Sequence, residues 1–183
     1  PAGSAELYLF GAHVTAWTPQ GGRPVLFTSR RARFDGETSI RGGVPLCLPW
    51  FSVGPRGVSR PKHGWARIMS WTLRSVETTR AGGVRALLSL EHDAVSVLYE
   101  VTVGRTLTMT LSLRNTGAEP RLVEAAAHLC GRARCHRLRS DRSRGRRLHR
   151  GRRLGAADGS GQGHRPHRSH VPLPGAGARD RSR

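Results

Sequence analysis

The stretch Arg105-Thr106-Leu107-Thr108-Met109-Thr110-Leu111-Ser112-Leu113 alternates polar and apolar residues with period two. Because successive side chains of a strand point to opposite faces, this pattern predicts a β-strand with one buried face. Residues 84–90 repeat the alternation, and residues 95–103 repeat it more loosely. Asn115-Thr116-Gly117, directly after the first stretch, is a turn signal. Short alternating strands without helical periodicity predict an all-β chain folded as an antiparallel β-sandwich.

The composition changes abruptly at about Glu124. Residues 125–183 contain 16 Arg and three Asp, but no Thr, Ile, Lys, Asn, Met, Glu, Phe, Tyr or Trp. A segment with so few apolar residues and so much like charge cannot build a core. We therefore expect a β-sandwich domain over residues 1–124 and a disordered basic tail over residues 125–183.

The genetic code suggests an origin for this tail. All of its 59 residues except two Cys and five Ser have codons that begin with G or C. Such a bias at one codon position is typical of the third position in a GC-rich gene, here displaced to the first. We therefore interpret residues 125–183 as a frameshifted continuation. The alternative is a β domain with an Arg-rich tail selected to bind nucleic acid, whereas an accidental polycation would bind it only non-specifically.

Cationic side chains gather in two Gly- and Pro-containing segments that lack periodicity, and such loops commonly carry binding groups. Arg41 precedes Gly42-Gly43, which lets backbone approach a ligand closely. Lys62, the only lysine of the chain, and His63 lie shortly before Arg67. Guanidinium groups offer paired donors that match phosphate, and histidine can donate or accept near neutral pH. Trp50, Phe51 and Trp65 are candidates for an apolar surface against a sugar.

Several motifs in order carry a family resemblance: GAHVTAW (11–17), VLFTS (25–29), IRGGVP (40–45), PLCLPWF (45–51), HGWAR (63–67) and LRNTGAEP (113–120). Over roughly residues 5–124 the chain resembles the glucose-6-phosphate 1-epimerase (hexose-6-phosphate mutarotase) branch of the aldose 1-epimerase family. The resemblance implies a galactose mutarotase-like supersandwich, here truncated, whose members interconvert the α and β anomers of a sugar. The substrate implied is a hexose 6-phosphate such as glucose 6-phosphate; an unphosphorylated aldose is the alternative.

The resemblance also implies roles for particular residues. Arg41, Lys62, His63 and Arg67 would bind the sugar phosphate, and His128 occupies the position of the catalytic histidine. Re-reading residues 127–130 in another frame permits Leu-His-Thr-Tyr, the family's text around that histidine. By this resemblance the family's general-base glutamate has no counterpart here, and we expect that a first strand or two of the family fold is missing. We therefore expect an enzyme by family whose particular chain is inactive.

No cofactor or metal is expected. His128, Cys130, Cys135 and His136 do not have the spacing of a standard zinc site. Three unevenly placed cysteines do not make a disulfide framework, and Cys47 in its apolar run is expected to be buried. Without a secretory signal or a long apolar run, we expect a cytoplasmic protein that is not inserted in a membrane. The sequence gives no indication of oligomeric state.

Overall fold

The computed structural model describes residues 2–131, 146–148 and 170–172. In this part of the chain the regular elements are strands and one turn of 3-10 helix, η1 (Ala66–Ile68). The strands are β1 (Gly3–Tyr8), β2 (His13–Pro19), β3 (Leu46–Cys47), β4 (Thr72–Thr78), β5 (Val84–His92), β6 (Val95–Val103), β7 (Leu107–Asn115), β8 (Arg121–Val123), β9 (Ala126–Ala127), β10 (Arg146–Leu148) and β11 (His170–Pro172).

Strands β4, β5, β6 and β7 form an antiparallel sheet in that order. Its inner face follows from period-two alternation, because every second residue of β6 from Val95 to Val103 is buried. The register places apolar residues opposite one another across the strands, as in the row formed by Leu88, Tyr99 and Leu111. Such cross-strand pairs stabilise a sheet wherever one of its faces is covered.

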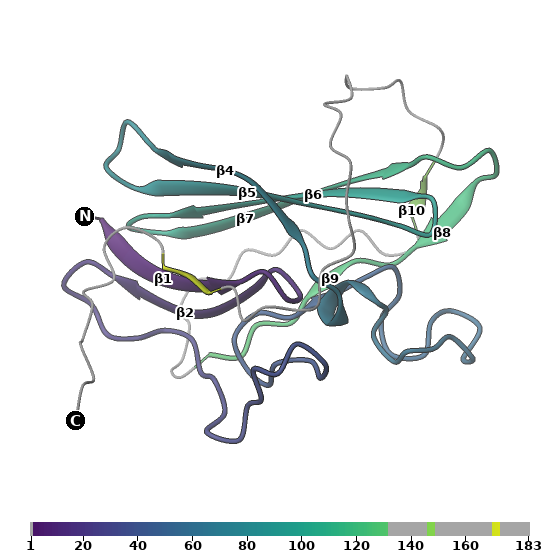
Figure 1. Cartoon of the computed structure of the whole chain (residues 1–183), viewed down its shortest axis with the longest axis horizontal. Helices are drawn as coiled ribbons and strands as arrows, with labels where there is room; N and C mark the ends of the chain where they lie inside the picture. Colours follow the sequence, from purple (N-terminus) through teal and green to yellow (C-terminus); the bar gives the residue numbers. More distant parts are fainter. Residues whose placement is uncertain (1, 132–145, 149–169, 173–183) are drawn as a thin grey trace.

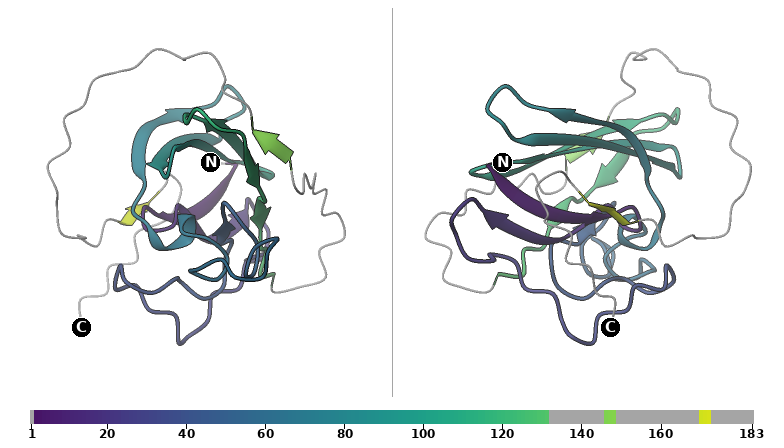
Figure 2. Two further views of the ribbon diagram at one scale, coloured as in Figure 1. Left: turned by 90° about the vertical axis from the view of Figure 1, so that its right-hand side faces the viewer. Right: turned by 60° about the vertical axis from the view of Figure 1, so that its left-hand side comes forward.

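The second layer is the antiparallel pair of β1 and β2, with β11 on the outer side of β1. Figure 1 shows the four-stranded sheet lying over this pair, and the two views of Figure 2 show the same arrangement. One apolar core joins the layers, with Leu7 of β1 and Val14 of β2 in the same cluster as Leu88 and Tyr99. Trp71 is buried in this core and lies edge-on to Tyr99, with ring centroids 6.1 Å apart.

The predicted architecture is confirmed. Residues 84–90, 95–103 and 105–113 form β5, β6 and β7, within about two residues of the predicted ends. The predicted turn is also present, since the backbone N–H of Gly117 donates to Oδ1 of Asn115 at 3.0 Å. Trp17 of β2 is partly buried against the same core as Trp71.

Three short strands follow Glu124, where the sequence has no alternating pattern. β9 pairs with β3, β10 pairs with β8, and β11 pairs with β1. Strands of two or three residues are too short to show alternation, so the sequence pattern does not indicate them. The predicted domain boundary at residue 124 remains a prediction, because most of residues 125–183 lie outside the described residues.

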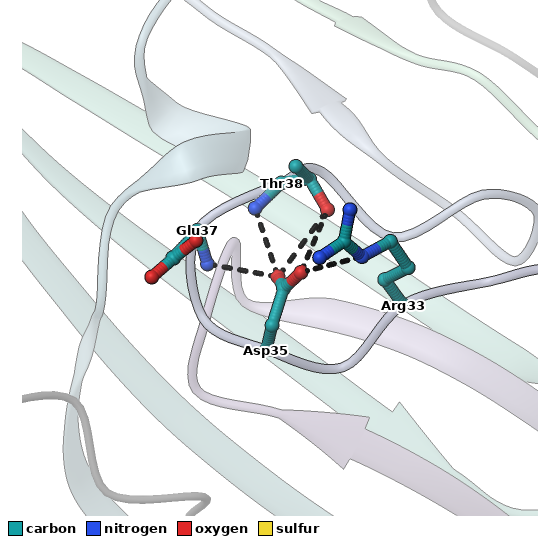
Figure 3. Close-up of polar contacts among 4 residues, drawn as sticks. All are labelled: Arg33, Asp35, Glu37 and Thr38. Carbon is teal, nitrogen blue, oxygen red and sulfur yellow. Dashed lines mark hydrogen bonds and ion pairs between the residues drawn. The ribbon is translucent and has the colours of Figure 1, made fainter.

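A long loop between β2 and β3 carries Arg41, and one carboxylate organises its middle. Asp35 accepts hydrogen bonds from the backbone N–H groups of Glu37 and Thr38, both at 3.0 Å, and forms an ion pair with Arg33 at 2.9 Å (Figure 3). These contacts, first of all the bond from Thr38, lower the pKa of Asp35 to about 2. The ring of Phe34, beside them, packs on Tyr8 of β1. The loop is therefore tied both internally and to the sandwich.

None of the helical segments in the described residues is long and apolar enough to cross a membrane.

Candidate functional site

The segment that follows Arg41 is clamped between two others. The N–H of Gly43 donates to the carbonyl of Phe27 at 2.7 Å, and the N–H of Val44 donates to Val14 at 2.9 Å. Gly42 has φ +103°, and a Cβ there would lie 2.4 Å from the carbonyl oxygen of Phe27. Both the positive φ and this close approach require glycine. The exposed Arg41 side chain therefore projects from a tightly fixed piece of backbone.

His13 lies beneath this segment and is fully buried. Its Nε2 atom lies 2.7 Å from the carbonyl oxygen of Gly42. A carbonyl can only accept, so Nε2 carries the proton and donates. Burial lowers the pKa of His13 to about 4; the bond to Gly42 opposes this shift, and the positive charge of Arg67 adds to it. His13 is therefore neutral at physiological pH.

The second cationic segment is a turn that leads into η1. A guanidinium N–H of Arg67 (Nη2) donates to the carbonyl of Lys62 at 2.9 Å. Between them Gly64 has φ +76°, and a Cβ there would lie 1.8 Å from the carbonyl oxygen of Leu48. Arg67 was expected in a loop, but it lies within η1, whose three residues are too few for a periodic signal. This hydrogen bond closes a ring over residues 62–67, with Lys62 at one end and Arg67 at the other.

His63 occupies the middle of this turn with φ +69°. Its backbone N–H donates to the carbonyl of Ser52 at 2.6 Å, and its Nδ1 accepts from the N–H of Ser52 at 3.2 Å. Its ring also lies edge-on to Phe51, with centroids 4.9 Å apart. Burial lowers the pKa of His63, and so do the positive charges of Arg67, Lys62 and His128, in that order. The predicted cations Lys62 and Arg67 therefore act on the same histidine as His128.

His128 lies on a segment that runs antiparallel to residues 43–49. Its backbone N–H donates to the carbonyl of Pro45 at 3.1 Å, just beyond the pairing of β9 with β3. The side chain of His128 is exposed. The segment that carries His128 therefore pairs with the one that follows Arg41, although some eighty residues separate them in the sequence.

The site has an excess of positive charge. No ion pair joins a carboxylate of the described residues to Arg41, Lys62 or Arg67. The nearby carboxylate of Glu124 accepts a hydrogen bond from the backbone N–H of Phe51 at 3.1 Å. Grouped cations repel one another, and an anion with several oxygen acceptors relieves this repulsion. The arrangement suits a phosphate group.

Two expectations about nearby side chains had different outcomes. Trp65 was a candidate for contact with a sugar, but this was wrong because it is buried and its ring packs edge-on against His92 at 4.8 Å. Phe51 remains exposed, and Trp50 is only partly buried. Cys47 is buried, as expected, and burial raises the pKa of its thiol.

The described residues contain no cluster of His, Cys, Asp or Glu that could hold a metal ion. Of the four residues considered for a zinc site, His128 and Cys130 are described, whereas Cys135 and His136 lie outside the described residues.

Sequence reasoning missed two residues that shape the site, His13 and Glu124. His13 belongs to the GAHVTAW motif, but nothing in the sequence indicates that its ring reaches Gly42. Glu124 marks the point where the composition changes, yet its contact with Phe51 spans 73 residues. Contacts over such separations leave no local pattern.

The sequence pattern of aldose 1-epimerases matches residues 1–130. The chain belongs to the aldose 1-epimerase family. Among its relatives, a protein of Escherichia coli K12 named "putative glucose-6-phosphate 1-epimerase" is 45% identical over 103 residues, which are 56% of this chain and 30% of the relative. A protein of the same name from Cenchrus ciliaris is 44% identical over 69 residues, covering 38% of this chain and 20% of the relative.

Two solved structures have a fold similar to that of this chain. A "putative mutarotase (YeaD)" from Salmonella typhimurium has 29% identity and a TM-score of 0.58, with 68% of this chain and 45% of that chain covered. The structure of HI1317 has 32% identity and a TM-score of 0.57, with 69% and 45% covered. The chain thus spans less than half the length of these structures and about a third or less of the curated relatives.

Proposed function

We propose that this member of the aldose 1-epimerase family carries the phosphate-recognising part of a hexose-6-phosphate mutarotase site. The observation that carries the proposal is the state of Arg67. It is fixed by the carbonyl of Lys62, has no ion pair with a carboxylate of the described residues, and lowers the pKa of His63. A dianionic phosphate supplies the missing counter-charge, whereas an uncharged sugar does not.

The substrate in this proposal is glucose 6-phosphate or a closely similar hexose 6-phosphate. Arg41 and Arg67 hold the phosphate with paired N–H donors, and Lys62 contributes a point charge. His63 donates to a phosphate or sugar oxygen. The exposed ring of Phe51, beside His63, offers an apolar surface to one face of the sugar.

Mutarotation proceeds through the open-chain aldehyde. An acid protonates the ring oxygen while a base removes the proton of the C1 hydroxyl, and the ring then closes on either face of the carbonyl. We assign the acid to His128, which the backbone pairing brings to the strand that follows Arg41. No residue of the chain is assigned as the base. Because the acid acts in concert with a base, whose loss typically costs about 10²–10⁴-fold, we propose that this chain binds the sugar phosphate without measurably accelerating its anomer exchange.

Exchange spectroscopy of the two anomers by NMR tests the proposal. The chain as given should leave the exchange rate of glucose 6-phosphate at its buffer value. A version in which the codons after Glu124 are returned to the other frame should accelerate the anomer exchange of glucose 6-phosphate more than that of glucose. Equal acceleration of both sugars would refute phosphate specificity, and acceleration by the chain as given would refute its inactivity.

A further inference from the structure

One short segment, Gly11–Val14, contacts both backbone segments that carry the arginines. Toward Arg41, the carbonyl of Val14 accepts the N–H of Val44, and the ring of His13 reaches the carbonyl of Gly42. Toward Arg67, the N–H of Gly11 donates to the carbonyl of Met69 at 2.7 Å, and a Cβ on Gly11 would lie 2.8 Å from the carbonyl oxygen of Arg67. The two arginines therefore share one support at the start of β2.

Within this support, the ring of His13 is the side chain that contacts the segment carrying Arg41. None of the backbone N–H groups of the described residues donates to the carbonyl of Gly42, so the 2.7 Å bond from His13 satisfies it. The bond gives this part-buried carbonyl its donor and fixes the orientation of the peptide unit. Gly43 completes the fit, because a Cβ there would lie 2.9 Å from Nε2 of His13.

An apolar side chain of similar size would fill the same space without holding Gly42. Nδ1 of His13 has no hydrogen-bond partner among the described residues. A fully buried histidine that uses one nitrogen is costly compared with leucine or methionine. Among the described residues its ring makes one hydrogen bond, to Gly42 directly after Arg41, and we take this bond rather than packing to explain its position.

We propose that His13 is a positioning residue, which holds the Gly42 carbonyl and thereby sets Arg41 against Arg67 to receive a phosphate. This rests on the proposed function. A donor at this position is required, while charge is not, because the neutral ring with its proton on Nε2 makes the contact. Glutamine can present an N–H at nearly the same place, and methionine matches the volume without a donor.

The test is a titration of the full chain and its variants with glucose 6-phosphate and glucose, analysed as a double-mutant cycle. His13→Met should weaken glucose 6-phosphate binding about tenfold, while His13→Gln should stay within about threefold of the parent. In an Arg41→Ala background, His13→Met should cause no further loss. An equal loss in both backgrounds, or full affinity in His13→Met, would overturn the positioning role.

A second measurement concerns the parent chain itself. The ¹⁵N spectrum of the parent chain, with the His13 signals assigned by their loss in His13→Gln, should show a protonated Nε2 and a bare Nδ1. The opposite tautomer would overturn the proposal. If the parent binds glucose and glucose 6-phosphate equally, the proposed function fails. If it prefers the phosphate but His13→Met binds as well as the parent, only the role of His13 fails.

Discussion

Nη2 of Arg67 donates to the carbonyl oxygen of Lys62 at 2.9 Å, which closes a ring of six residues with His63 inside it. The guanidinium thus fixes the backbone of the turn and still presents other N–H donors. Its Nε lies buried without a partner among the described residues. One arginine therefore connects the shape of the turn with the charge of the site.

The first prediction concerns that charge. Arg67→Ala should weaken glucose 6-phosphate binding by about 2 kcal/mol, or about 30-fold in Kd, because a charge-assisted hydrogen-bond donor is lost. Affinity for glucose should change little. Arg80→Ala, in the turn between β4 and β5, removes the same charge outside the site and is the matched control. Equal effects of the two variants on phosphate binding would indicate general electrostatic attraction instead.

The second prediction concerns the backbone of the turn. Gly64→Ala should lower the free energy of unfolding by about 3 kcal/mol or more, because its Cβ would overlap the carbonyl of Leu48. Gly57 is a close control, since it has φ +72° but nothing within 4 Å of an added Cβ. Gly57→Ala should cost only the conformational strain, about 1–2 kcal/mol. Urea unfolding measures both, and equal costs would show that the contact with Leu48 is unimportant.

The third prediction concerns pH. The pKa of His13 is about 4 in the folded chain, below its ordinary value of 6.5. As pH falls below 6.5 the unfolded state takes up a proton that the folded state refuses, so stability falls until about pH 4. The loss from this group is at most about 3 kcal/mol. His13→Gln should flatten the profile of unfolding free energy against pH in this window.

The part of the stability profile below about pH 4, the acidic limb, provides an internal reference. Asp35 has its pKa lowered to about 2, so its contribution is present above the ordinary value of 3.8 and is lost as pH falls through about 2. His13→Gln should leave this lower limb unchanged. A variant profile that is parallel to the parent between pH 6.5 and 4 would contradict the assignment to His13.

The fourth prediction concerns the origin of residues 125–183. If they are a frameshifted continuation, the gene should be rich in G and C at first codon positions after Glu124 and at third positions before it. Reading the nucleotide sequence decides this. A third-position bias that continues to the end would instead favour a selected basic tail, whose binding of RNA or DNA should then show sequence preference.

Strands β5, β6 and β7 could be predicted from sequence because each is long and has one face in the core, which forces period-two alternation. β3 and β9 could not, because two residues show no period and their pairing joins residues eighty positions apart. The long loop before β3 is held by Asp35 and by glycines with positive φ, and local hydrophobic patterns do not report either device.

The site could be predicted only in part. The motifs indicated Arg41, Lys62, His63, Arg67 and His128. The positive charges of three of them, Arg67, Lys62 and His128, lower the pKa of His63. Their assigned roles remain predictions. The burial of Trp65 could not be read from its place between Gly64 and Ala66. The support from His13 could not be foreseen either, because it depends on where the β2 segment passes beneath Gly42.

The most direct test of the account is the ratio of dissociation constants of the full chain for glucose and glucose 6-phosphate, measured by titration at one ionic strength. With Arg41, Arg67 and Lys62 available to the phosphate, glucose 6-phosphate should bind at least about 30-fold more tightly. Arg41→Ala and Arg67→Ala should each reduce this ratio. Equal affinities for the two sugars would contradict the claim that these cations form a phosphate site.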